Sequence, residues 1–262
     1  MSTTRLKAVL YQEYCITKNS LEITIDLFFF SIMSVTVFGF VSLFLVGSVN
    51  SAAAHYLLLG ILLWEIIRIT QYSMSVGSLW NIWSRNLSNM FITPLSLKEF
   101  MFAQMISGTV KALFTFIIIS LISLAIFDFN IFSIGAINLL MGFINLTIFS
   151  WTTGIIILGL IFRFGTRIQA LAWGLIFLFQ PLTASFFPLE IIPDFLKVVS
   201  YALPPTYVFE AARNALTDPS INWNFAVISF LQNIIYFLLS LWFFNAMFNK
   251  SKDTGQFARM EG

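Results

Sequence analysis

Three charged residues lie inside stretches that are otherwise almost entirely apolar. Glu65 and Arg68 fall within 56–77, and Lys111 falls within 100–127. The i, i+3 spacing places Glu65 and Arg68 on one helix face, and Lys111 has a similar depth on the next, antiparallel stretch. Because an unpaired ion in hydrocarbon costs roughly 2.5–3.5 kcal/mol, we expect the three residues to form one paired cluster inside the protein. Such a cluster could fix helix packing, or it could form a gate or polar contact in a transport path.

Other kinds of chemistry lack the residues that they need. The single Cys15 cannot form an intramolecular disulfide, and the single His55 cannot supply a cluster of histidine ligands. The sequence has neither a GxxxxGK[ST] phosphate loop nor an HExxH helix. It also lacks the paired aspartates or the Ser-His pair that an intramembrane protease needs. We therefore expect no enzyme active site, no metal site and no cofactor site.

The composition indicates that the chain is surrounded by lipid. Of its 262 residues, 58% are hydrophobic and 10% are charged, whereas soluble domains carry about 25% charged residues. Too few charged side chains are present to cover a surface that faces water on every side. The net charge of +2 and the scattered basic residues also argue against nucleic acid as a partner.

The charge-poor windows predict six membrane spans. Each window is about 20 residues long or longer, which is the length that a helix needs to cross the hydrocarbon core. These segments must be helical, because a single strand would leave its backbone groups unpaired in lipid. The windows are 27–49, 56–77, 100–127, 134–161, 168–187 and 225–248. We expect an all-α integral membrane protein, with residues 1–262 forming one transmembrane domain.

Basic residues are distributed unequally between alternate loops. If the N-terminus is cytoplasmic, the outer segments hold only Lys197 and Arg213. The inner segments then hold Arg5, Lys7, Lys18, Arg85, Lys98, Arg163, Arg167, Lys250, Lys252 and Arg259. The positive-inside rule therefore predicts that both termini are cytoplasmic, in a multi-pass protein of the plasma (inner) membrane.

Residues 4–18 are a candidate interfacial helix before the first span. Helical spacing places Leu6, Val9, Leu10 and Tyr14 on one face. Such a helix would lie along the inner leaflet, with its basic residues near anionic lipid headgroups. The alternative is an ordinary basic flank without a defined helix.

The inner loop between the second and third spans contains a second amphipathic pattern. Leu87, Met90 and Phe91 have the i, i+3, i+4 spacing of a short helix, which Pro94 ends. The sequence 96–99, Ser-Leu-Lys-Glu, fits a capping box that begins the next helix. A short helix at this position could dock another protein, or it could be the inner end of the second span lying in the interface.

The outer segment 185–223 is long and unusually apolar for a loop. Its prolines divide it into pieces, and we expect one short helix over 195–203 and another over 207–216. Such a hairpin could dip into the outer leaflet beside a path, since non-helical backbone at that depth must be surrounded by protein or line a cavity. Alternatively, it is an amphipathic lid on the surface.

Two of these segments resemble the permeases of type 2 ATP-binding-cassette (ABC) exporters. Residues 85–100, RNLSNMFITPLSLKEF, are similar to the family's inner-loop pattern of an arginine, a leucine-rich turn and a Pro-Leu-Ser step. Residues 188–213, PLEIIPDFLKVVSYALPPTYVFEAAR, are similar to its outer hairpin. Many relatives have an Arg-Glu pair followed by Gly-Thr in the inner loop, where this chain has Arg85-Asn86 and Ser88-Asn89.

The resemblance implies an interfacial first helix, six spans, a cytoplasmic coupling helix and a re-entrant outer hairpin. It further implies a homodimer and a separate ATPase subunit that binds the ATP. The coupling residues would be Arg85, Asn86, Leu87, Met90 and Phe91. Those of the hairpin would be Pro193, Pro205, Tyr207, Glu210 and Arg213.

The function that this resemblance implies is the outward transport of a lipophilic or glycan-type substrate. Aromatic residues near the outer mouth could stack on sugars or accept apolar molecules equally well, or they could simply form an interfacial belt, which is the more common role of such residues. The alternative is an ATP-independent six-helix channel or secondary transporter. Inverted repeats would favour that class, and the two halves of the sequence show no convincing similarity to each other.

Overall fold

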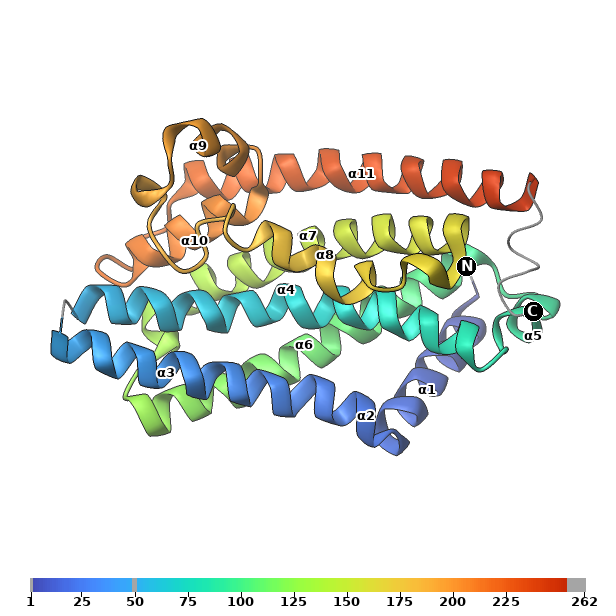
Figure 1. Ribbon diagram of the computed structural model, residues 1–262, viewed down its shortest axis with the longest axis horizontal. Helices are drawn as coiled ribbons and strands as arrows, with labels where there is room; N and C mark the ends of the chain where they lie inside the picture. The colour runs from blue at the N-terminus through green and yellow to red at the C-terminus, as the bar shows by residue number, and fades with distance from the viewer. Residues whose placement is uncertain (1, 49–50, 254–262) are drawn as a thin grey trace.

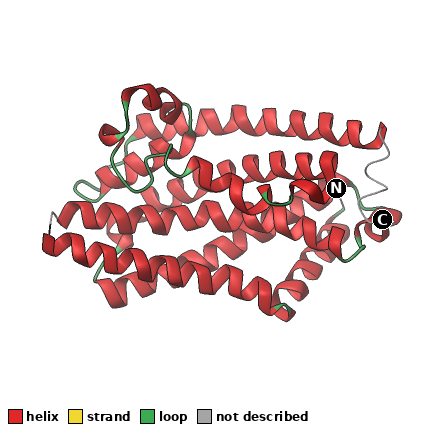
Figure 2. Cartoon of the chain, viewed as in Figure 1, coloured by secondary structure: helices red, strands yellow, loops and turns green. Residues whose placement is uncertain are grey.

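The computed structural model describes residues 2–48 and 51–253, and the regular elements within these ranges are all helical (Figure 2). The long helices lie roughly side by side along the long axis of the molecule (Figure 1). They are α3 (Phe30–Ser48), α4 (Ser51–Trp83), α6 (Leu97–Phe127), α7 (Ala136–Phe164) and α11 (Trp223–Asp253). A short helix α2 (Leu21–Thr24) and a π-helical turn, Ile25–Phe29, lead into α3.

Within the described ranges, five helical stretches are long and apolar enough to cross a membrane. They correspond to five of the six windows, and their bounds are Leu21–Val46, Ala52–Trp83, Leu97–Phe127, Ala136–Ile168 and Trp223–Asp253. The expectation of an all-α multi-pass membrane protein is therefore confirmed, whereas the count of six spans is not.

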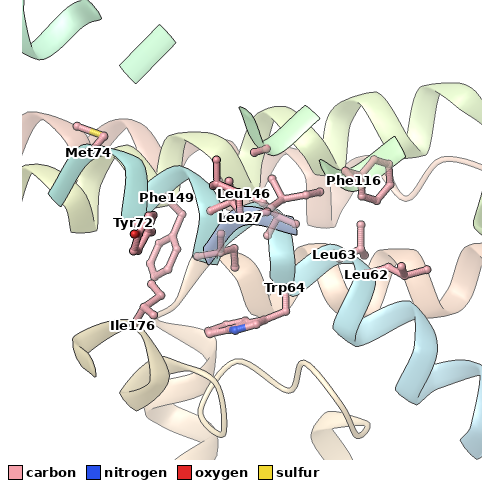
Figure 3. Packing of buried hydrophobic residues seen from close by; sticks show 14 of the residues in the cluster. Leu27, Leu62, Leu63, Trp64, Tyr72, Met74, Phe116, Leu146, Phe149 and Ile176 are labelled. Carbon is pink, nitrogen blue, oxygen red and sulfur yellow. The ribbon is translucent and has the colours of Figure 1, made fainter. Parts of the chain in front are cut away.

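Helix α4 lies at the centre of the bundle. The consecutive residues Leu62, Leu63 and Trp64 are all buried, although they point in different directions (Figure 3). A helix that is buried all round must have neighbours on every side, and α4 packs against α3, α6, α7 and α8. In contrast, α3 and α11 expose large apolar side chains such as Phe44 and Trp242. These outer faces suit contact with lipid.

The window 168–187 does not form one long helix. After the 3-10 turn Gly165–Ile168, helix α8 covers only Leu171–Phe179. The helix ends there because Pro181 has no amide hydrogen to donate, and its ring would clash with the carbonyl four residues earlier. At 1.5 Å per residue, α8 is less than half the length of a typical span. The chain nevertheless returns from the α5 end of the bundle towards α9 (Figure 1).

The irregular segment after α8 is buried in protein. Thr183, Ala184 and Ser185 are fully buried, and the Ser185 hydroxyl donates to the Gln180 carbonyl at 2.9 Å. The segment packs against α4 at Gly60, where an added Cβ would lie 2.0 Å from the Ser185 carbonyl oxygen. Glycine is therefore required at this position, because only a residue without a side chain lets the two backbones approach so closely.

Short helices cover the two ends of the bundle (Figure 1). At one end lie α9 (Asp194–Tyr201) and α10 (Pro204–Ala215), after a 3-10 turn at Leu189–Ile191. Their positions confirm the two short helices expected in the outer segment, while a re-entrant depth remains a prediction. At the opposite end lie α1 (Thr3–Asn19), α5 (Leu87–Ile92) and the last turns of α11. Both helices expected in the inner segments are present.

Candidate functional site

Helix α5 is a short element at the edge of the bundle end that also holds α1. Arg85 has a left-handed backbone conformation (φ 54°), and Asn86 precedes the first residue of the helix. Thr93, before Pro94, is extended, as the proline requires. The structure describes the backbone of α5 but not the side chains of Leu87, Ser88 and Phe91, so the expected contacts of Leu87 and Phe91 lie outside the described residues.

The described side chains of α5 divide into a packed face and an open face. Met90 is buried in a small hydrophobic cluster with Val9, Phe100 and Ala103, separate from the main core. Ile92 is 82% exposed, although isoleucine is apolar. Through Met90 the helix is thus anchored to α1 and α6, while the other side chains that the structure describes in α5, Asn89 and Ile92, are exposed.

Glu99 connects the start of α6 with α1. Its side chain accepts from the Ser96 amide at 3.0 Å, and its own amide donates to the Ser96 hydroxyl at 3.3 Å. The expected capping box is therefore confirmed. The other oxygen, Oε1, accepts from the Ser2 amide at 2.7 Å and lies 3.3 Å from the Arg5 guanidinium. Arg5 also donates to the Pro94 carbonyl, so the α5–α6 turn and α1 share one polar junction.

A second polar contact joins α1 to α6 farther along both helices. The Lys111 ammonium lies 3.3 Å from Glu13 Oε2, and the Gln104 amide donates to Glu13 Oε1 at 2.8 Å. Glu13 and Lys111 are both largely removed from solvent. In addition, Gln12 donates to Asn81 Oδ1 at 3.1 Å, which connects α1 to the end of α4.

Glu65 and Arg68 form a separate buried pair between α3 and α4. Arg68 Nη2 donates to Glu65 Oε2 at 2.6 Å, and its Nε donates to the same carboxylate at 2.9 Å. The Ser31 hydroxyl lies 2.7 Å from both Arg68 Nη2 and Glu65 Oε2. The expected pairing of Glu65 with Arg68 is thus present. The inclusion of Lys111 in that cluster is corrected, because Lys111 pairs with Glu13.

The residues of the α9–α10 hairpin, which the sequence analysis expected on the outer side, stabilise its fold. Pro193 precedes α9, and Pro205 lies in the first turn of α10, where a missing amide hydrogen costs nothing. Glu210 Oε1 accepts from the buried Arg213 at 2.7 Å and from the Leu189 amide at 2.8 Å. This junction fixes α10 against the turn that precedes α9.

A pocket of about 310 Å³ opens between α9, α10 and the start of α11. Its walls include Tyr201, Tyr207, Glu210 and Lys197. Burial raises the pKa of the Tyr207 phenol, whose hydroxyl donates to the Tyr201 carbonyl at 3.0 Å. The Lys197 ammonium donates to Asp194 at 2.7 Å and lowers the pKa of that exposed carboxyl.

Sequence reasoning overlooked Glu13, although a signal was present. Glu13 follows Val9 by four residues, so it lies on the apolar face of α1 rather than on the polar one. An acidic residue on an apolar face needs a buried partner. Sequence reasoning also missed a network between α7 and α11, in which the Asn233 amide donates to Asn145 Oδ1 at 3.1 Å and Ser229 donates to the same oxygen at 3.3 Å.

A model of the family described as ABC-2 type transporter matches residues 4–217, which is more than half of the chain. The chain belongs to the ABC-2 type transporter family. The match includes α1, α5 and the outer hairpin and ends just before α11. The comparison with curated proteins gave no match.

Membership in the ABC-2 family, together with the apolar helices, makes the chain a permease and a multi-pass membrane protein. Permeases of this family generally lack an ATPase site of their own. The family therefore implies that an ATP-binding-cassette subunit is the partner of this permease.

Proposed function

We propose that this permease forms the membrane path of an ABC exporter and moves its substrate outward with ATP hydrolysed by a separate subunit. The observation that carries the proposal is the pairing of the family match with the geometry of α5. This helix is anchored through Met90 and exposes Ile92 at the end of the bundle that also holds α1. A short, anchored helix with an open apolar residue is suited to insertion into a groove of a partner.

The orientation rests on the distribution of charge. Among the described residues, the basic residues counted for the inner segments belong to α1, the turns on either side of α5, the end of α7 with the turn after it, and the last turns of α11, which lie at one end of the bundle. By the positive-inside rule, this distribution supports a cytoplasmic α5 in a protein of the plasma (inner) membrane. A cytoplasmic ATPase can reach α5 only in this orientation.

We further propose that two copies of the permease assemble as a homodimer above two ATPase subunits. Closed two-fold symmetry is the commonest arrangement of homo-oligomers, and the exposed apolar faces of α3 and α11 offer surface for lipid or a second copy. The substrate class is lipophilic or glycan-type, in keeping with the aromatic residues of the outer pocket. The ATP-independent channel or secondary transporter remains the competing function.

Replacing Ile92 with Glu tests the docking role of α5. Because Ile92 is 82% exposed, the fold should tolerate the substitution, while a charge at the centre of an apolar contact should weaken ATPase binding. We expect loss of permease-stimulated ATP hydrolysis by a coexpressed ATP-binding-cassette subunit in reconstituted membranes.

Ile191→Glu is the matched control, since Ile191 is 68% exposed at the opposite end of the bundle. This variant should retain the stimulated rate. Equal rates for the wild type and the Ile92 variant would exclude α5 as the docking element. Transport by the permease alone in vesicles without ATP would instead support the channel or secondary transporter.

A further inference from the structure

The N-terminal helix α1 is bound to the α5–α6 region by more than apolar packing. At its start, Ser2 and Arg5 both bind Glu99 Oε1, and Arg5 also donates to the Pro94 carbonyl. Two turns later, Glu13 pairs with Lys111. Helix α1 is therefore attached to α6 at two points about three turns of α6 apart.

Glu99 is the residue that joins these elements. Its two oxygens have different partners: Oε2 accepts from Ser96 and so caps α6, whereas Oε1 faces Ser2 and Arg5 of the α1 end. The carboxylate is almost fully buried, with 1% of its side chain exposed. A buried carboxylate whose partners are removed leaves an uncompensated charge, so separation of α1 from α6 is unfavourable.

The small hydrophobic cluster extends this junction to α5. Met90 of α5, Val9 of α1 and Phe100 of α6 are buried together, apart from the main core. A displacement of α5 would therefore carry α1 and the first turn of α6 with it. The Glu13–Lys111 pair would transmit the same displacement to the middle of α6.

We propose that Glu99 is a positioning residue that makes α1, α5 and the start of α6 move as one unit during transport. This inference rests on the proposed function, in that the ATPase is the source of the displacement of α5. Helix α1 then transmits the displacement of α5 to α6 at Lys111, in addition to any role as a membrane-surface anchor.

Two substitutions separate positioning from simple helix capping. Glu99→Gln keeps an oxygen that can cap α6, because glutamine also serves in a capping box, but it removes the negative charge that faces Arg5. Ser96→Ala removes the hydroxyl that caps α6 and leaves the Glu99 carboxylate available to Ser2 and Arg5. Arg5→Gln removes the charge from the other side of the contact.

The first measurement is hydrogen exchange in the full-length permease without any ATPase. Glu99→Gln and Arg5→Gln should both increase exchange in α1 and α5, and the double variant should add little to either alone. Ser96→Ala should increase exchange only in the first turn of α6. If Glu99→Gln leaves α1 protected, or if Ser96→Ala affects α1 equally, Glu99 is only a helix cap and the proposal is wrong.

The second measurement is ATP hydrolysis by the permease with a coexpressed ATP-binding-cassette subunit. Glu99→Gln and Arg5→Gln should keep the stoichiometry of the complex but lower the stimulated rate about fivefold, at the low end of typical coupling between sites. Ser96→Ala should keep the rate. An unchanged rate of ATP hydrolysis despite increased exchange in α1 would show that the Glu99–Arg5 contact has only a structural role. If the wild type binds no ATPase, the proposed function fails, whereas the exchange experiment still decides whether α1, α5 and α6 form one unit.

Discussion

Glu65, Arg68 and Lys111 belong to two separate ion pairs rather than to one cluster. Glu65 shares its carboxylate with Arg68 and Ser31, whereas Lys111 and Glu13 connect two other helices. Each positive charge has its own counter-ion, so each pair can be broken without affecting the other. This arrangement allows the α3–α4 contact and the α1–α6 contact to contribute independently to stability.

A double-mutant cycle should detect this independence. Glu13→Gln and Lys111→Met should show a coupling energy of about 0.5–3 kcal/mol, because they remove the two halves of one contact. Glu65→Gln and Lys111→Met should instead be additive to within about 0.5 kcal/mol, since their partners differ. Thermal unfolding of the single and double variants in detergent provides the measurement. Strong coupling between Glu65 and Lys111 would restore the single cluster expected from the sequence.

The Glu65–Arg68 pair could be predicted from the sequence and the Glu13–Lys111 pair could not, for a physical reason. Glu65 and Arg68 lie three residues apart, so helical periodicity alone brings them together. Lys111 and Glu13 are 98 residues apart, and their contact depends on how α1 crosses α6. Periodicity defines the faces of a helix, but it does not define which helix each face meets.

At the scale of elements, local rules located some helix boundaries. The capping box at Ser96 and Glu99 and the end of α5 before Pro94 follow from neighbouring residues, whereas α10 begins at Pro204, three residues before the start expected at 207. The window 168–187 differed most from the structure. The hydropathy of this window describes transfer into lipid, whereas the end of α8 depends on the backbone chemistry of a single residue, Pro181.

The contact between α4 and the irregular segment after α8 should depend on the absence of a side chain at residue 60. In Gly60→Ala, the new Cβ would lie 2.0 Å from the Ser185 oxygen, so one backbone must shift. We expect a loss of about 1–3 kcal/mol, as for other overpacked interiors, and faster hydrogen exchange over 182–186. The melting temperature in detergent and the exchange of peptides from this segment provide the readouts.

Gly174→Ala is the control for that experiment. An added Cβ at Gly174 has no neighbour within 4 Å, and alanine favours helix by up to about 1 kcal/mol relative to glycine. The Gly174 variant should be as stable as the wild type or slightly more stable. A stable Gly60 variant with unchanged hydrogen exchange would show that the segment can move away from α4 without a loss of stability.

At the scale of the whole molecule, the two ends of the bundle differ in what they present. One end combines α1, α5 and basic residues around a small hydrophobic cluster, and the other carries α9, α10 and a pocket with polar and aromatic walls. Composition and loop charge were sufficient to predict this division of the chain. The grouping of α1 with α5 was not predictable in the same way, because it depends on contacts between distant residues such as Val9 and Met90.

Labelling of introduced cysteines should determine which end faces outward. In a Cys15→Ala background, Asn224→Cys at the exposed start of α11 should react with a membrane-impermeant maleimide in intact cells. Lys98→Cys, exposed at the opposite end, should react only after the cells are lysed. The positive-inside rule gives this expectation. The reverse labelling pattern would invert the topology and remove α5 from the reach of a cytoplasmic ATPase.

The early end of α8 also affects how the newly made chain can enter a membrane. A long helix pairs its own backbone amides and carbonyls, so it can move by itself from the insertion machinery into the lipid. The segment after Phe179 has turns whose amides and carbonyls would face lipid. The protein that surrounds this segment includes α4, which is synthesised earlier and contacts Ser185 at Gly60. We therefore expect the chain between α7 and α9 to remain at the insertion site until it packs against α4. Final assembly of this permease is consequently a joint step of several helices rather than a sequence of independent insertions.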